Sequence, residues 1–289
     1  MSGAAGVARA ATGPTRLAPL QLAALVATLL LTALLALPLL GLLTHVTPAA
    51  LLARLGDASV RDALRLSLVT SGSATLIVAL LGTPAAWLLA TRSFRGRRVL
   101  EVLLDLPMVM PPTLAGFALL LAFGRMGLAG RPLAAAGITL PFSTAGVVLA
   151  QVFMSAPFFL ASARAGFAGV DARLLDAAAT LRAGETQRFL RVVLPLAAPS
   201  LLAGLAMSAA RALGEFGASI TFAGNLRGVT QTMPLAIYVA MESDLDAAIV
   251  LSVLLLLMSL ALLLAMRAAA RGAWPGWLRA GRPDPAPAR

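Results

Sequence analysis

Long hydrophobic runs, separated by short polar segments rich in arginine, make up most of this chain of 289 residues. A helix needs about 20 such residues to cross the hydrocarbon layer of a bilayer. The pattern therefore predicts an all-α, polytopic membrane protein with six transmembrane helices, at 19–43, 64–90, 106–123, 144–164, 196–220 and 246–266. Pro107, Pro111 and Pro112 are expected to bend or interrupt the third helix, because proline lacks the amide hydrogen that a helix needs.

The composition supports a membrane protein and also indicates its orientation. Hydrophobic residues make up 60% of the chain and charged residues 12%, whereas soluble domains contain about 25% charged residues. The net charge of +11 would suggest nucleic-acid binding in a soluble protein, but here its distribution follows the rule that basic residues gather on the cytoplasmic side. With the N-terminus inside, sixteen arginines are cytoplasmic: Arg9, Arg16, Arg92, Arg95, Arg97, Arg98, Arg164, Arg173, Arg182, Arg188, Arg191, Arg267, Arg271, Arg279, Arg282 and Arg289. Six are outside: Arg54, Arg61, Arg65, Arg125, Arg131 and Arg227. We therefore expect a multi-pass protein of the plasma membrane with both termini in the cytoplasm.

Four segments are expected along the chain. The first hydrophobic run is too long for a signal-peptide core and lacks a clear cleavage site, so it is expected to stay as an anchor. The predicted organisation is a disordered N-terminal tail (1–18), a first transmembrane helix with an outer loop (19–59), a transmembrane domain (60–266) that contains a cytoplasmic loop (166–195), and a basic C-terminal tail (267–289).

Residues that could perform catalysis are scarce. The chain has no Lys, which a phosphate-binding P-loop requires, and no Cys and a single His, His45, which argues against thiolate and multi-histidine metal sites. We therefore expect no catalytic residue, no metal and no cofactor. An intramembrane enzyme would need a nucleophile paired with a base, and this sequence offers no such pair.

The cytoplasmic loop before the fifth hydrophobic run is expected to form a helical elbow. Asp171 is a plausible N-cap, and Leu174, Ala177, Ala178 and Leu181 follow at helical spacing as a narrow stripe. Ala183 and Gly184 are expected to end this helix, and a second short helix carries Phe189, Val192 and Val193 before Pro195 and Pro199 mark the fifth span. The elbow could insert into a groove of a cytosolic partner. It could equally lie among lipid headgroups, with Arg182, Arg188 and Arg191 on phosphates.

Three motifs around this loop resemble the EAA loop of ABC-importer permeases, the binding-protein-dependent type I importers. They are Asp176-Ala177-Ala178, Leu194-Pro195 and Gly214-Glu215-Phe216-Gly217. The resemblance implies that an ATPase contacts Asp176, Ala177, Ala178, Leu181, Arg182, Gly184, Leu194 and Pro195. One position departs from the family pattern: its central glycine falls at Arg182 here, with Gly184 two residues later. The bend between the two coupling helices is therefore left open.

Further segments resemble the oxyanion branch of these permeases. They are 106–113, 124–128 and 211–219, and the segments 220–225, 230–234 and 237–238 are most similar to the molybdate branch. The resemblance implies a non-enzymatic permease subunit that translocates molybdate or tungstate as a homodimer. Its implied partners are two ATP-binding subunits, an extracytoplasmic oxyanion-binding protein and membrane lipid, with no nucleic acid. A sulfate or thiosulfate importer and, from another class, a secondary transporter are the alternatives.

Ionisable residues inside the predicted fifth helix need a partner or an aqueous cavity. Arg211 and Glu215 are four residues apart and so share one face of that helix. They could form an internal ion pair, or Arg211 could help a tetrahedral dianion pass while Glu215 sets a gate. Gly214 and Gly217 permit close helix contact, and Ser219 is assigned with them to the gate or pathway. Glu101 and Asp105 are expected to be solvated caps at the cytoplasmic mouth of the third helix.

Overall fold

The computed structural model describes residues 19–272, in which every regular element is a helix. The predicted tails, 1–18 and the part of 267–289 beyond Gly272, lie outside the described residues. The chain separates into two compact units, one ending at Val46 and the other beginning at Thr47. The first unit contains α1 (Pro19–Thr44), a 26-residue apolar helix that is long enough to cross a membrane.

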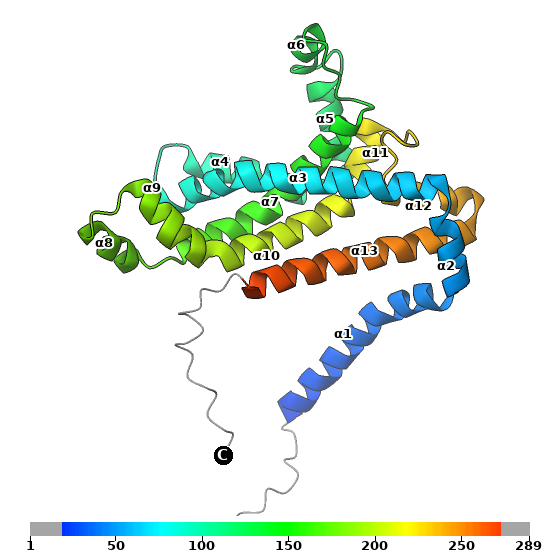
Figure 1. Cartoon of the computed structure of the whole chain (residues 1–289), viewed down its shortest axis with the longest axis horizontal. Coiled ribbons are helices and arrows are strands. Elements are labelled where there is room, and N and C mark those ends of the chain that lie inside the picture. The colour runs from blue at the N-terminus through cyan, green and yellow to red at the C-terminus, as the bar shows by residue number, and fades with distance from the viewer. Residues whose placement is uncertain (1–18, 273–289) are drawn as a thin grey trace, which may run out of the picture. The chain divides into compact units, whose positions relative to one another are not determined.

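The second unit is built on four long helices that run side by side (Figure 1): α3 (Ala58–Thr91), α7 (Thr144–Ala168), α10 (Leu194–Leu213) and α13 (Leu245–Gly272). At one end of this bundle are α8 (Ala172–Thr180) and α9 (Glu185–Arg188), and at the other are α2 (Pro48–Leu55) and α12 (Met233–Ser243). Beside the bundle lie α4 (Arg97–Val109), α5 (Pro112–Phe123), α6 (Gly130–Ala135) and α11 (Gly217–Ala223). In Figure 1, α5 and α6 project away from the long helices.

Small residues let the long helices approach closely, which is the usual basis of helix packing in membranes. A methyl group added at Gly204 of α10 would lie 2.9 Å from the Cβ of Ser162 on α7, and one added at Gly82 of α3 would lie 2.7 Å from the Phe159 ring. Ser162 also donates a hydrogen bond of 2.7 Å to the Ser200 carbonyl. These contacts position α7 between α3 and α10.

The number of predicted spans agrees only partly with the structure, since six spans were predicted. Five helical stretches in residues 19–272 are long and apolar enough to cross a membrane: α1, α3, α7, α13 and the stretch Glu185–Leu213. The predicted third span, 106–123, is interrupted as expected: α4 ends at Val109 and α5 begins at Pro112, because Pro111 and Pro112 have no amide hydrogen to donate, whereas Pro107 lies inside α4. The predicted fifth span, 196–220, also proved to be broken, after Leu213.

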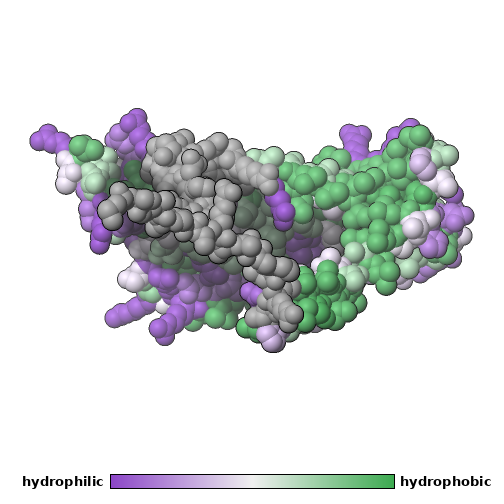
Figure 2. All heavy atoms as spheres, turned by 90° about the horizontal axis from the view of Figure 1, so that it is seen from below, coloured by the Kyte–Doolittle hydropathy of each residue, from purple (hydrophilic) through white to green (hydrophobic). Residues whose placement is uncertain are grey.

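The surface is that of a protein that is solvated by lipid. Large apolar side chains are exposed along the long helices, among them Leu80, Leu81 and Leu88 on α3. Figure 2 shows hydrophobic residues over much of the visible face between the two ends, and hydrophilic residues at both ends, one of them the end formed by α8 and α9. The polar elbow and the apolar bundle are thus segregated along the molecule.

Candidate functional site

The loop before the fifth predicted span contains the predicted helix, α8. Asp171 caps it as predicted, because its carboxylate accepts a 2.9 Å hydrogen bond from the Arg173 amide. Asp176, Ala177 and Ala178 lie on α8, and the predicted stripe faces away from the bundle: Leu174 is 42% exposed and Leu181 is 83% exposed. Leu175, on another face, packs against the apolar core. Ala177 is exposed as well and Ala178 is half-buried, so most of the stripe is available to a partner.

The loop bends at Arg182. Arg182 adopts a φ of +59°, the left-handed conformation that favours glycine. Its amide donates to the Ala179 carbonyl at 2.9 Å, and the Ala183 amide donates to the Ala178 carbonyl at 3.1 Å. This pair of bonds is the Schellman motif that ends many helices. The expectation that Ala183 and Gly184 end the helix was wrong: Gly184 has an extended φ of −66° and precedes α9. Arg182 itself therefore supplies the left-handed conformation at this bend.

The second half of the elbow is continuous with the next span, contrary to the prediction of a separate short helix. Residues 185–188 form α9, residues 189–193 form a π-helical segment, and α10 follows directly. The amide of Leu194 donates to the Phe189 carbonyl five residues earlier, as in a π-helix. Because Pro195 cannot donate, the wider π turn accommodates it. Leu194 and Pro195 therefore lie in the first turn of α10.

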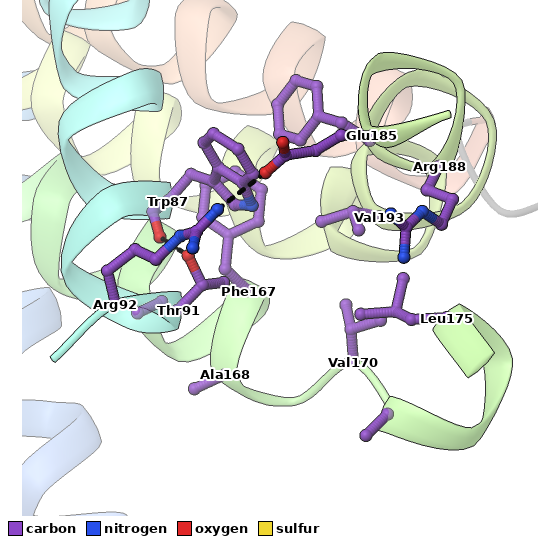
Figure 3. A pocket seen from close by; sticks show the side chains of 13 residues that line it. Trp87, Thr91, Arg92, Phe167, Ala168, Val170, Leu175, Glu185, Arg188 and Val193 are labelled. Atoms are coloured by element: carbon purple, nitrogen blue, oxygen red, sulfur yellow. Dashed lines mark hydrogen bonds and ion pairs between the residues drawn. The ribbon is translucent and has the colours of Figure 1, made fainter. Parts of the chain in front are cut away.

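Behind the elbow is a cavity of about 550 Å³ (Figure 3). Aromatic rings form one wall: the Trp87 and Phe189 ring centroids are 4.9 Å apart, and those of Phe167 and Phe189 are 6.2 Å apart. Arg92, just after α3, forms a 2.8 Å ion pair with Glu185 of α9. The bridge and the rings attach the elbow to the ends of α3 and α7.

Helical structure is interrupted a second time between α10 and α11, at Gly214, Glu215 and Phe216. Glu215 is fully buried, and its Oε1 accepts a 2.7 Å hydrogen bond from the Ala218 amide in the first turn of α11. Its other carboxylate oxygen is paired with the guanidinium of Arg211, whose side chain is 24% exposed. The ion pair that the spacing suggested is therefore present. It lies at a break between two helices and not within one continuous helix.

Only one of the two glycines at this break makes the predicted close contact with another helix. A methyl group at Gly217 would lie 2.7 Å from the Pro112 Cβ of α5, whereas one at Gly214 would meet only the Ala210 carbonyl, at 3.6 Å. Gly116 of α5 also lies against the α11 backbone, because a methyl group there would be 2.7 Å from the Ala218 carbonyl oxygen. Ser219, on α11, is buried. The break is thus packed against the proline-rich third span.

Sequence reasoning missed a group of buried polar side chains near this break: Gln151, Ser155 and Ser208. None of their side-chain polar atoms that are buried has a hydrogen-bond partner in the described residues. The contacts of Ser162 with Gly204 and of Gly166 with Ser200 set the antiparallel register of α7 and α10. Continued two turns along both helices, that register places Ser155 level with Arg211, next to the break. The sequence contained one signal for this group, the single Gln within the apolar run 144–164.

The expectation of solvated caps at the third span was wrong. Asp105 of α4 accepts two 2.8 Å hydrogen bonds from one nitrogen of Arg164 on α7. Glu101 forms a 2.9 Å ion pair with Arg97, one helical turn away. The two carboxylates neutralise arginines, and Asp105 attaches α4 to the bundle.

Comparison with known proteins shows the family of this chain from its sequence. The family described as "Binding-protein-dependent transport system inner membrane component" matches residues 82–274. The "Molybdenum transport system permease protein ModB" of Mycobacterium tuberculosis is 45% identical over 226 residues, which are 78% of this chain and 85% of that protein. The protein of the same name from Escherichia coli K12 is 42% identical over 183 residues, 63% of this chain and 80% of its own length.

The fold is similar to that of solved importers. A bacterial ABC transporter "involved in the import of the acidic polysaccharide alginate" has a chain that superposes with a TM-score of 0.72, at 16% identity, and the match covers 87% of this chain and 95% of that one. At that identity the likeness concerns the fold alone.

Proposed function

Because this chain belongs to the family of binding-protein-dependent transport system inner membrane components, we propose that it is the permease subunit of an ATP-driven importer of molybdate. The observation that carries the substrate is the 45% identity to a molybdenum permease over 78% of the chain. As a family member it is a multi-pass protein of the inner membrane and a transport component rather than a catalytic one. Both termini are cytoplasmic in this proposal, which the distribution of arginines supports.

ATP is bound and hydrolysed by a separate subunit, two copies of which dock on the elbow of a permease homodimer. The exposed Leu174 and Leu181 of the α8 stripe support this docking, since they present apolar side chains away from the bundle. The residues proposed for contact are those named from the sequence: Asp176, Ala177, Ala178, Leu181, Arg182, Gly184, Leu194 and Pro195.

Movement of the elbow is proposed to reach the break through α10. The helix of 20 residues spans about 30 Å, at 1.5 Å per residue. At its far end the Arg211–Glu215 pair, with Gly214, Gly217 and Ser219, forms the proposed gate of the pathway. Closure of the ATPases rotates the elbows and opens the cavity outward, and hydrolysis restores the inward state. An extracytoplasmic binding protein delivers the oxyanion.

The docking assignment is tested with Ala178→Trp. A bulky ring on the stripe blocks close approach of the ATPase, so co-purification of the ATPase is expected to be lost while the permease still inserts in the membrane. Ala179→Trp is the control, because Ala179 is exposed, carries the same small side chain and lies on the opposite side of α8 from the stripe. Normal ATPase recovery with Ala178→Trp would refute the docking assignment.

The substrate is tested on the complex reconstituted in liposomes with its own binding protein. Molybdate and tungstate are nearly equal in size and charge, so both are expected to stimulate ATP hydrolysis to a similar extent, and sulfate weakly. Stimulation by sulfate but not by molybdate would assign the protein to the sulfate and thiosulfate importers. Substrate accumulation without any dependence on ATP would instead indicate a secondary transporter.

A further inference from the structure

The cavity behind the elbow has features of a binding site that ATPase docking does not explain. A second cavity of about 430 Å³ adjoins it, and the two share Trp87, Arg92, Glu185 and Phe189 as lining residues. Cavities of this combined size hold ligands with polar and apolar parts. The aromatic pair and the Arg92–Glu185 bridge thus separate two compartments of one site.

Arg188 gives the larger compartment its charge. It lines that cavity, and in Figure 3 its guanidinium is turned toward the gap beside Leu175 and Val170. Its Nε is buried without a hydrogen-bond partner, and its side chain has no ion pair in the described residues. Arg92, by contrast, is already neutralised by Glu185. A buried guanidinium nitrogen without an acceptor favours an anion that supplies one.

The smaller compartment opens onto the lipid-facing side of the bundle. Leu88 lines it and is 44% exposed. Leu81 and Leu80, two turns earlier on α3, are exposed as well. Trp87 stands near the end of the same helix, where tryptophan typically marks the level of the headgroups. An acyl chain lying along this part of α3 would therefore lead into the aromatic compartment.

We propose that these two compartments bind an anionic phospholipid of the cytoplasmic leaflet, with its phosphate on Arg188 and its chain beside Trp87 and Leu88. The proposal rests on the membrane orientation given under the proposed function. A free phosphate would satisfy Arg188 but would leave the aromatic compartment without an apolar partner. Ala172 and Leu175 of α8 form another wall of the larger cavity, so the lipid would also hold the coupling helix in position.

The test compares Arg188→Gln with Arg191→Gln in the permease–ATPase complex. Both variants remove one positive charge from the same turn of the elbow, but Arg191 is exposed and does not line either cavity. The probe is phosphatidylglycerol in mixed phosphatidylglycerol and phosphatidylcholine nanodiscs, and co-purified lipid is measured by native mass spectrometry. Retention of phosphatidylglycerol is expected to fall about fivefold in Arg188→Gln, the effect of one basic residue at an anionic surface, and to stay at the wild-type level in Arg191→Gln.

Val170→Trp is the second variant, because it fills the larger cavity without changing any charge. It is expected to displace the lipid as Arg188→Gln does, and it decides the matter if Arg188→Gln does not assemble. Equal phosphatidylglycerol retention in wild type, Arg188→Gln and Val170→Trp would overturn the proposal. Displacement of the lipid by millimolar inorganic phosphate would overturn it as well, in favour of a free phosphate. Lipid retention is read without any transport substrate, so a failed molybdate assay leaves this result independent.

Discussion

The bend at Arg182 in the elbow and the break after Leu213 are two interruptions at opposite ends of the helical stretch Glu185–Leu213, and they are built from opposite chemistry. At the elbow, Arg182 is exposed and the backbone satisfies its own hydrogen bonds through the Schellman motif. At the break, Glu215 is fully buried, and its charged side chain satisfies the backbone amide of Ala218. Water allows the first to keep its side chains free for a partner. The membrane interior requires the second to be neutralised by Arg211.

The comparison also separates what each site can do. An exposed bend held by backbone bonds can present side chains to another protein and tolerate their replacement. A buried break held by an ion pair is sensitive to any change of charge or volume. One helix connects the two, so a change at either end has a direct mechanical path to the other. The predictions below follow the comparison from its largest expected consequence to its smallest.

Removing one member of the buried pair is expected to have the largest effect. Glu215→Gln leaves Arg211 without its carboxylate, and breaking a buried ion pair costs about 3–5 kcal/mol. The double change to Gln at both positions is expected to be less destabilising than Glu215→Gln alone, because no unpaired charge remains. Thermal unfolding of the detergent-solubilised permease measures both. A double variant that is no more stable than Glu215→Gln would contradict coupling between the two residues.

The two interruptions are expected to differ in their tolerance of an added methyl group. Gly217→Ala places Cβ 2.7 Å from the Pro112 Cβ, and such overpacking costs about 1–3 kcal/mol. Gly184→Ala meets nothing within 4 Å, at a φ that any residue adopts. Melting temperatures should therefore fall for Gly217→Ala and stay unchanged for Gly184→Ala. A stability loss at Gly184 would show that the elbow is as tightly packed as the break.

Arg182→Gly is expected to stabilise the elbow slightly. A left-handed φ is costly for a residue with a Cβ and free of that cost for glycine, so the gain is up to about 1 kcal/mol. Hydrogen–deuterium exchange of the α8 amides should slow, since the Schellman bonds open less often. Faster exchange would indicate that the Arg182 side chain, and not the backbone conformation, holds the bend.

Another carboxylate, Asp244, extends the comparison to a partly exposed helix start. It accepts a 3.0 Å hydrogen bond from the Ala247 amide and forms a 2.8 Å ion pair with Arg54. The Ala247 amide first, and then Arg54, lower the pKa of Asp244 below its usual value. Its contribution to stability is complete above the unfolded value of about 3.9 and is lost as pH falls through the lower folded pKa.

The melting temperatures of wild type and Asp244→Asn are therefore expected to differ slightly at neutral pH and to converge below about pH 4. Glu215→Gln serves as the contrast, because it is destabilised by an unpaired Arg211 and should not converge with wild type in the same way. A constant difference between wild type and Asp244→Asn across this range would mean that the charge of Asp244 does not contribute.

Hydrophobic periodicity and motif resemblance were sufficient to predict an all-α membrane protein, the permease family and the capped helix at Asp171. These follow from features that are local in the chain: run length against bilayer thickness, capping chemistry and short motifs. The Arg211–Glu215 pair was also predictable, because its members are one helical turn apart.

Tertiary structure decided the features that join distant segments, and those for which two neighbouring residues were alternatives. The spacing of Arg211 and Glu215 did not reveal that the helix breaks between Leu213 and Gly217. Packing of Gly217 on Pro112 holds this break. The bend at Arg182 depended on which of two neighbouring positions would accept a left-handed φ, and propensity alone favoured Gly184. The pairing of Asp105 with Arg164, and the burial of Gln151 between helices, required the register of α7 against its neighbours. Hydropathy specifies which segments enter the membrane, but the contacts between those segments form only once the helices have packed.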